Sequence, residues 1–236
     1  MTSYLVSMAT FGAIYAILAL ALNLMWGLTG MVNLGVVGFY AFGGYLSALA
    51  TVELGLLKRA LGDAFNVSYL GFTLLMLVVA MVLVERIRTA PFGRALRAIR
   101  EDAQVAAFAG KDVFALKVQA FAIGGGIAGL AGALYAHYTS YIVPEIYVPL
   151  LTIYIFLALT AGGLANTWGA TLGAFAIVFC LESTRFLIGV IPSIGAERLA
   201  ALREFLVGLC LLLVLLYRPR GLLPERLPRL GASRQG

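Results

Sequence analysis

The stretch Thr89–Lys117, TAPFGRALRAIREDAQVAAFAGKDVFALK, is a long charged interruption in an otherwise apolar sequence. Pro91 suits the first turn of a helix, where its missing N–H costs no hydrogen bond, and Gly110 suits the position just past a helix end. Between them, apolar and polar residues recur at three- and four-residue steps on two different faces. The apolar face comprises Phe92, Leu96, Ile99, Ala103 and Ala106, and the polar face Arg94, Arg97, Glu101 and Gln104. The spacing predicts a short amphipathic helix held at a membrane surface.

Two interpretations of this predicted helix remain open at this point. It is either a solvated loop that only fixes the orientation of the chain in the membrane, or a docking helix for a soluble partner. Both interpretations place residues 89–117 outside the lipid.

The composition places the rest of the chain in a membrane. Of the 236 residues, 62% are hydrophobic and 12% are charged, with a mean hydropathy of +0.98. Soluble domains are about half apolar and about a quarter charged, so this chain has too little charge for a water-facing surface. Several apolar runs reach the roughly 20 residues that cross a bilayer as a helix. The expected fold is a single all-α domain over residues 1–236, a bundle of about six or seven transmembrane helices.

The basic residues predict the orientation of that bundle. The apolar runs cover residues 4–26, 31–52, 69–84, 118–138, 150–161, 170–188 and 205–217. Lysine and arginine gather in residues 86–117 and again in the tail, 218–236, so both segments are expected on the cytoplasmic side. If every run crosses, the N-terminus lies outside. The glycines of run 31–52 also permit a re-entrant segment, which would place the N-terminus inside.

The sequence lacks the residues that several other functions need. It has no G-x-x-x-x-G-K-[ST] phosphate loop, so we do not expect it to hydrolyse ATP or to be an enzyme. It has no metal-ligating cluster, and its net charge of +6 lies between and after apolar runs, where it sets orientation and does not indicate a nucleic-acid partner. Buried carboxylates that would drive an ion-coupled carrier are nearly missing. Glu182 and Arg185 are the exception, and their spacing allows them to pair on one helix face.

A glycine-rich face is predicted in the run 118–138. Gly125 and Gly129 form a GxxxG, and Gly132 continues the small-residue spacing. Small residues allow two helix backbones to approach closely in a membrane. We therefore expect these three glycines to pack against another helix.

Five segments in order resemble the permeases of branched-chain amino-acid ABC importers. They are residues 21–49 (ALNLMWGLTGMVNLGVVGFYAFGGYLSAL), 91–110 (PFGRALRAIREDAQVAAFAG), 126–138 (GIAGLAGALYAHY), 162–174 (GGLANTWGATLGA) and 216–223 (LYRPRGLL). The last segment is also similar to sugar and urea permeases, so the resemblance identifies the family more securely than the substrate.

The resemblance implies a pore subunit of the bacterial inner membrane. Its implied partners are a second permease, homologous or identical, two cytoplasmic ATPases that hold ATP and magnesium, and an extracytoplasmic binding protein. This chain itself would need no cofactor. The segment 91–110 would dock in a groove of an ATPase through Arg94, Arg97, Arg100, Glu101 and Gly110, with Arg97 and Glu101 facing the partner. Asn33, Gly35 and Phe39 would line the translocation pathway.

The chain departs from the family pattern in the middle. Only residues 51–88 separate the glycine-rich run from the charged segment, which leaves room for one span where relatives have more. Ala103 and Ala107 also stand where relatives often carry acids. A shortened, non-transporting scaffold of the same family is therefore an alternative, as is a permease for urea or short amides.

Overall fold

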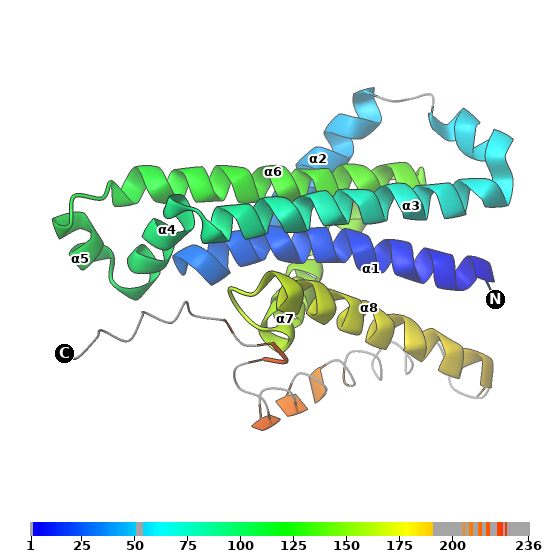
Figure 1. Cartoon of the computed structure of the whole chain (residues 1–236). Helices are drawn as coiled ribbons and strands as arrows, with labels where there is room; N and C mark the ends of the chain where they lie inside the picture. Colours follow the sequence, from blue (N-terminus) through cyan, green and yellow to red (C-terminus); the bar gives the residue numbers. More distant parts are fainter. Residues whose placement is uncertain are drawn as a thin grey trace, which may run out of the picture.

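The computed structural model describes residues 2–50 and 54–190 and, beyond them, residues 205, 208–209, 212–213, 216–217, 221–223 and 225. No strand occurs in this part of the chain. Three long helices lie side by side in Figure 1: α1 (Thr2–Leu22), α3 (Leu54–Thr89) and α6 (Val113–Thr139). The shorter α2 (Val36–Ala50), α7 (Pro149–Gly162) and α8 (Thr167–Val190) pack around them. Helical turns η1 (Asn23–Gly27) and η2 (Pro144–Ile146) extend α1 and precede α7.

Helix α1 is the centre of the bundle. It contacts α3, α6, α7 and α8, and from Ile14 to Leu22 nearly every side chain is fully buried. A helix that is apolar on all faces is buried on all faces, and apart from Tyr15 α1 has only small and aliphatic residues over this length. The other helices therefore assemble around α1.

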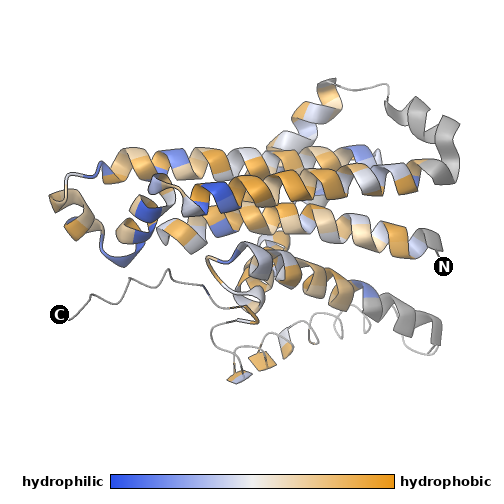
Figure 2. Cartoon of the chain, viewed as in Figure 1, coloured by the Kyte–Doolittle hydropathy of each residue, from blue (hydrophilic) through white to orange (hydrophobic). Residues whose placement is uncertain are grey.

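Several helices are apolar enough to cross a membrane. Three are also long enough: Tyr4–Gly27, Phe65–Thr89 and Val113–Thr139. Three shorter apolar helices accompany them, over Val36–Leu49, Pro149–Gly162 and Thr167–Glu182. Figure 2 shows their apolar surfaces, with hydrophilic residues collected at the α4 end. The predicted all-α membrane fold is confirmed, and the protein is a multi-pass membrane protein. In the predicted span 205–217, residues 206–207, 210–211 and 214–215 lie outside the described residues.

Helix α3 is much longer than the predicted span 69–84. It has 36 residues and therefore a length of about 54 Å, against a hydrocarbon core of about 30 Å. Its membrane-spanning part, Phe65–Thr89, exposes a row of valines and leucines that would face lipid: Leu75, Val78, Val79 and Val82. A single helix thus connects the glycine-rich α2 to the charged segment, as the short spacing predicted.

Glycines allow α2 to lie directly on α6, in the most extensive helix pair of the structure. A Cβ atom added at Gly132 would lie 1.8 Å from the Tyr40 carbonyl oxygen, and one at Gly125 would lie 2.9 Å from the Phe39 ring. Gly129 faces Gly43, where an added Cβ would lie 2.0 Å from the Gly129 oxygen. All three glycines of the predicted packing face point at α2.

Two buried tyrosines differ in the hydrogen bonding of their hydroxyls. Tyr69 donates to the Leu134 carbonyl oxygen over 2.7 Å, whereas the fully buried Tyr40 hydroxyl has no partner among the described residues. A typical hydrogen bond contributes about 1 kcal/mol. We expect Tyr69→Phe to lower the melting temperature in detergent by about 2–4 °C and Tyr40→Phe to leave it unchanged or raise it. An equal loss in both variants would mean that Tyr40 has a partner.

The pairing predicted for Glu182 and Arg185 lies outside the described residues, because the side chain of Arg185 is not described. Glu182 accepts a hydrogen bond from the Tyr4 hydroxyl over 3.0 Å, which joins α8 to the start of α1.

Candidate functional site

The charged segment forms two helices at one end of the bundle, α4 (Pro91–Glu101) and α5 (Ala103–Phe108). They lie at the end opposite the N-terminus (Figure 1). Pro91 begins α4 as expected. Gly110 follows the end of α5 with a φ of +75°, a conformation that suits glycine. The prediction of one continuous helix is wrong.

Asp102 ends α4 and begins α5. Its backbone is extended, with φ −154° and ψ 109°, and its Oδ1 accepts hydrogen bonds from the amides of Gln104 (2.8 Å) and Val105 (3.1 Å). Aspartate is among the residues preferred at a helix N-cap, because its carboxylate satisfies amides at the helix start. The interruption between α4 and α5 is therefore explained by a residue of the segment itself, the N-cap Asp102.

The apolar face of α4 is buried as predicted. Leu96 is fully buried and Ile99 nearly so, and Ala106 of α5 is also buried. Gly93 lies against the end of α3, where an added Cβ would be 2.3 Å from the Ile87 carbonyl oxygen. Helix α4 is therefore seated on the bundle by apolar contacts and by close backbone approach.

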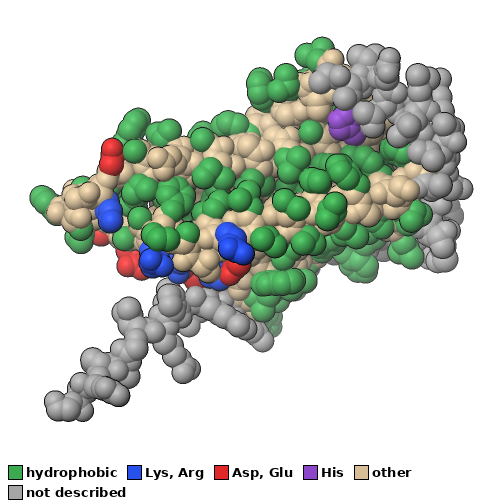
Figure 3. All heavy atoms as spheres, turned by 45° about the horizontal axis from the view of Figure 1, so that its top comes forward, with side chains coloured by type: hydrophobic (Ala, Val, Ile, Leu, Met, Phe, Trp, Pro, Cys, Tyr) green, Lys and Arg blue, Asp and Glu red, His purple; other side chains and the backbone are tan. Residues whose placement is uncertain are grey.

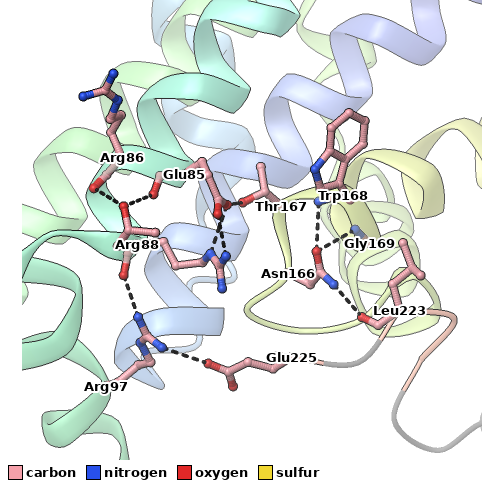
Figure 4. Close-up of polar contacts among 11 residues, drawn as sticks. Glu85, Arg86, Arg88, Arg97, Asn166, Thr167, Trp168, Gly169, Leu223 and Glu225 are labelled. Atoms are coloured by element: carbon pink, nitrogen blue, oxygen red, sulfur yellow. Dashed lines mark hydrogen bonds and ion pairs between the residues drawn. The ribbon is translucent and has the colours of Figure 1, made fainter. Parts of the chain in front are cut away.

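Arg97 and Arg100 point into the protein, which differs from the partner-facing role expected for Arg97. The Arg97 side chain is 13% exposed and lies 3.9 Å from the Glu225 carboxylate, and Arg100 lies 2.7 Å from the same carboxylate. Arg97 also donates to the Arg88 carbonyl oxygen over 2.6 Å (Figure 4). Arg100 donates to the Gly27 carbonyl oxygen at the end of η1. The two guanidinium groups thus serve contacts within the chain.

The turn between α7 and α8 lies beside this cluster. The Thr167 hydroxyl donates to Glu85 over 2.8 Å, and Glu85 also accepts from Arg88 over 3.0 Å. The Asn166 amide donates to the Leu223 carbonyl oxygen over 3.2 Å (Figure 4). Polar side chains therefore connect the end of α3 with the start of α8. They also connect α4 and the α7–α8 turn with residues 223 and 225 of the tail.

The surface at this end is partly charged and partly apolar. Arg94 and Glu101 are exposed. Val105 is 63% exposed and Phe108 is 92% exposed. In Figure 3 hydrophobic side chains appear at the tip of the molecule on the left, next to charged residues. Val105 and Phe108 were not among the predicted docking residues. Both are apolar residues of the charged segment that fall outside its apolar face.

Two of the three predicted pathway residues, Asn33 and Gly35, contact each other. The Asn33 side chain is buried, donates to the Met25 sulfur of η1 over 3.1 Å and accepts from the Gly35 amide over 2.9 Å. Phe39 of α2 packs against α6, with its ring centroid 5.2 Å from that of Phe121. A shallow apolar groove runs along this α2–α6 face past Phe39 and Gly129. A role of these residues in a pathway stays a prediction.

The chain is similar to known permeases. The family described as "Branched-chain amino acid transport system / permease component" matches residues 4–68 and 58–215. The probable branched-chain amino acid transport permease protein LivM of Methanocaldococcus jannaschii is 35% identical over 60% of this chain, and that alignment covers 42% of the archaeal protein. The high-affinity LivM permease proteins of Escherichia coli and Salmonella typhimurium are 23% identical over 95% of this chain and 71% of theirs. No solved structure matches.

These matches also bear on the predicted shortening of the middle. The alignment with the Escherichia coli protein has 317 positions, 81 more than the 236 residues of this chain (317 minus 236), so at least 81 positions have no residue here. The two matched segments of the family overlap at residues 58–68, inside α3. Both findings agree with an internal shortening there. Because the family matches residues 4–215 of the 236 in this chain, the chain belongs to the branched-chain amino acid transport permeases.

Proposed function

We propose that this chain is the permease subunit of an ATP-driven importer for branched-chain or related amino acids in a bacterial inner membrane. Its proposed partners are a second permease, two cytoplasmic ATPase subunits that bind magnesium ATP, and an extracytoplasmic binding protein. The family of the chain and the transport function of its relatives support this role.

The observation that carries the proposal is the exposed surface of α4 and α5. This surface lies at the end of the bundle where the basic residues gather, the end that the positive-inside rule assigns to the cytoplasm. Its exposed apolar residues, Val105 and Phe108, lie in the same short segment of the chain as the exposed charged residues Glu101 and Lys111. An apolar centre with a polar rim is the usual composition of a protein–protein interface.

The arginines of α4 divide between two roles in this proposal. Arg94, Glu101 and the Gly110 turn would contact the ATPase together with Val105 and Phe108. Arg97 and Arg100 would act on coupling from within, because they hold α4 against the rest of the chain.

Uptake by the reconstituted complex tests the proposal. Proteoliposomes would contain this chain, the second permease and the ATPases of the same genome, with the binding protein outside and ATP inside. We expect ATP-dependent accumulation of radiolabelled leucine that unlabelled isoleucine and valine suppress and urea does not. A complex with a hydrolysis-deficient ATPase is the control. If the ATPases bind other permeases of the same cells but never this chain, the proposal fails.

A non-transporting scaffold is the second candidate, because of the internal shortening of at least 81 aligned positions. Its expected result differs from that of a working permease. The ATPases would assemble with the chain, yet no labelled solute, neither leucine nor urea, would accumulate.

Thiol labelling tests the orientation. Lys111 and Glu145 are both exposed and lie in segments separated by α6. In a chain with Cys180 and Cys210 replaced by alanine, we expect Lys111→Cys to react with a membrane-impermeant maleimide only in inside-out vesicles. Glu145→Cys should react in intact cells. Labelling of Lys111→Cys in intact cells would place α4 and α5 on the wrong side for ATPase docking.

A further inference from the structure

A single carboxylate, that of Glu225, lies between the two inward-pointing arginines of α4. Its Oε2 is 2.7 Å from Arg100 and its Oε1 is 3.9 Å from Arg97. The Glu225 side chain is only 16% exposed. Two guanidinium groups therefore share one largely buried counter-charge, and its removal would take away the ion-pair partner of both.

Backbone hydrogen bonds fix the residues just before Glu225. The Leu222 amide donates to the Ala161 carbonyl oxygen over 2.8 Å, and the Leu223 amide to the Gly162 carbonyl oxygen over 2.9 Å. These carbonyls belong to the last turn of α7, whose acceptors have no partner within the helix. Glu225 is thus held at the C-terminal end of α7.

Arg100 extends the connection to the central helix. It donates to the carbonyl oxygen of Gly27, the last residue of η1, which continues α1. The chain approaches Arg100 closely again at Gly30, where an added Cβ would lie 3.2 Å from its Cγ. The Arg100–Glu225 pair therefore joins α4 at one point to α1 and to α7.

We propose that Glu225 is a positioning residue that ties α4 to α7 and holds Arg100 where it contacts α1, so that a displacement of α4 moves these helices with it. This inference rests on the proposed role of α4 in ATPase docking. Energetic coupling between distant sites is carried by such polar networks and by rigid helices. The packing of α4 on the bundle should not depend on Glu225, because Leu96 and Ile99 bury the apolar face of the helix.

A distance measurement tests the tie without any ATPase. Spin labels at Ala98→Cys on α4 and Trp168→Cys at the start of α8, both exposed positions, would report the distribution of distances between the two elements. We expect a narrow distribution with Glu225 present and a broader one with Glu225→Gln. Glu145→Gln, the same substitution in the exposed segment between α6 and α7, is the matched control and should leave the distribution narrow.

The assembled importer tests the consequence for coupling. We expect Glu225→Gln to lower the solute transported per ATP hydrolysed about tenfold, a coupling loss of ordinary size, whereas Glu145→Gln should not change it. Glu225→Asp retains the charge and should recover part of the ratio. In an Arg97→Gln/Arg100→Gln background, Glu225→Gln should have no further effect.

The outcomes separate this inference from the proposed function. If the distance distribution and the transport ratio both stay unchanged in Glu225→Gln, or if only the distribution broadens, Glu225 does not position α4 for coupling. If the distribution broadens but the ATPases fail to bind even the unaltered chain, the tie exists and the docking role of α4 is wrong.

Discussion

Gly132→Ala is expected to prevent α2 from seating on α6 and to abolish most of the folded protein. The added methyl carbon would lie 1.8 Å from the Tyr40 carbonyl oxygen and 3.0 Å from the Gly44 amide nitrogen. Both atoms belong to the α2 backbone, so no side-chain rotation relieves the overlap and the whole helix must move. Overpacking in a core typically costs about 1–3 kcal/mol, and a displaced helix should exceed that range. The yield of monodisperse protein and its melting temperature in detergent would measure the loss.

Gly126→Ala is the matched control for this substitution. Gly126 lies on the same helix six positions earlier, and an added Cβ there meets no atom within 4 Å. Alanine is favoured over glycine in a helix by about 1 kcal/mol, so we expect a stability equal to or above that of the unaltered chain. If Gly132→Ala melts like Gly126→Ala, the close approach of α2 to α6 is wrong.

The fold class was predictable because hydropathy alone determines it. An apolar run long enough to cross a bilayer has few other stable structures, and α1, α6, α7 and α8 lie within a few residues of their predicted runs. The extent of α3 was not predictable in the same way. Its first turns carry Lys58, Arg59 and Asp63. These charged residues interrupt the apolar run, so hydropathy does not indicate that the helix extends over them.

The candidate site was predictable in position but not in orientation. Periodicity correctly placed Leu96 and Ile99 on the buried face of α4. The partner of Arg100 is 125 residues away, and no local pattern reports a contact over that separation. One helical period over 91–110 also places Val105 and Phe108 opposite the apolar face, which agrees with their exposure. The period does not show that Asp102 interrupts the helix, because that break depends on the side-chain cap at Gln104 and Val105.

Phe108→Ser is expected to weaken binding of the ATPase about 30-fold while leaving the fold intact. The ring is 92% exposed, so its removal takes away almost no contact within the chain, and the melting temperature should stay the same. Aromatic residues that fill a partner's pocket often contribute about 2 kcal/mol or more to binding, which corresponds to that factor. Binding of detergent-solubilised chain to the purified ATPases by interferometry would measure it. Tyr141→Ser, which removes another exposed aromatic residue from the far end of α6, is the control.

The size of this effect relative to that of the exposed charges decides how α5 docks. Charges at the rim of an interface act mainly on the association rate and on its salt dependence. Arg94→Gln and Glu101→Gln together should therefore slow association at low salt but lower the affinity less than Phe108→Ser does. If the charge substitutions lower the affinity and Phe108→Ser leaves it unchanged, Phe108 does not anchor the interface. A Phe108→Ser variant that keeps its full affinity for the ATPase would contradict an apolar anchor whatever the charge substitutions do, because the ring would then not contact the partner.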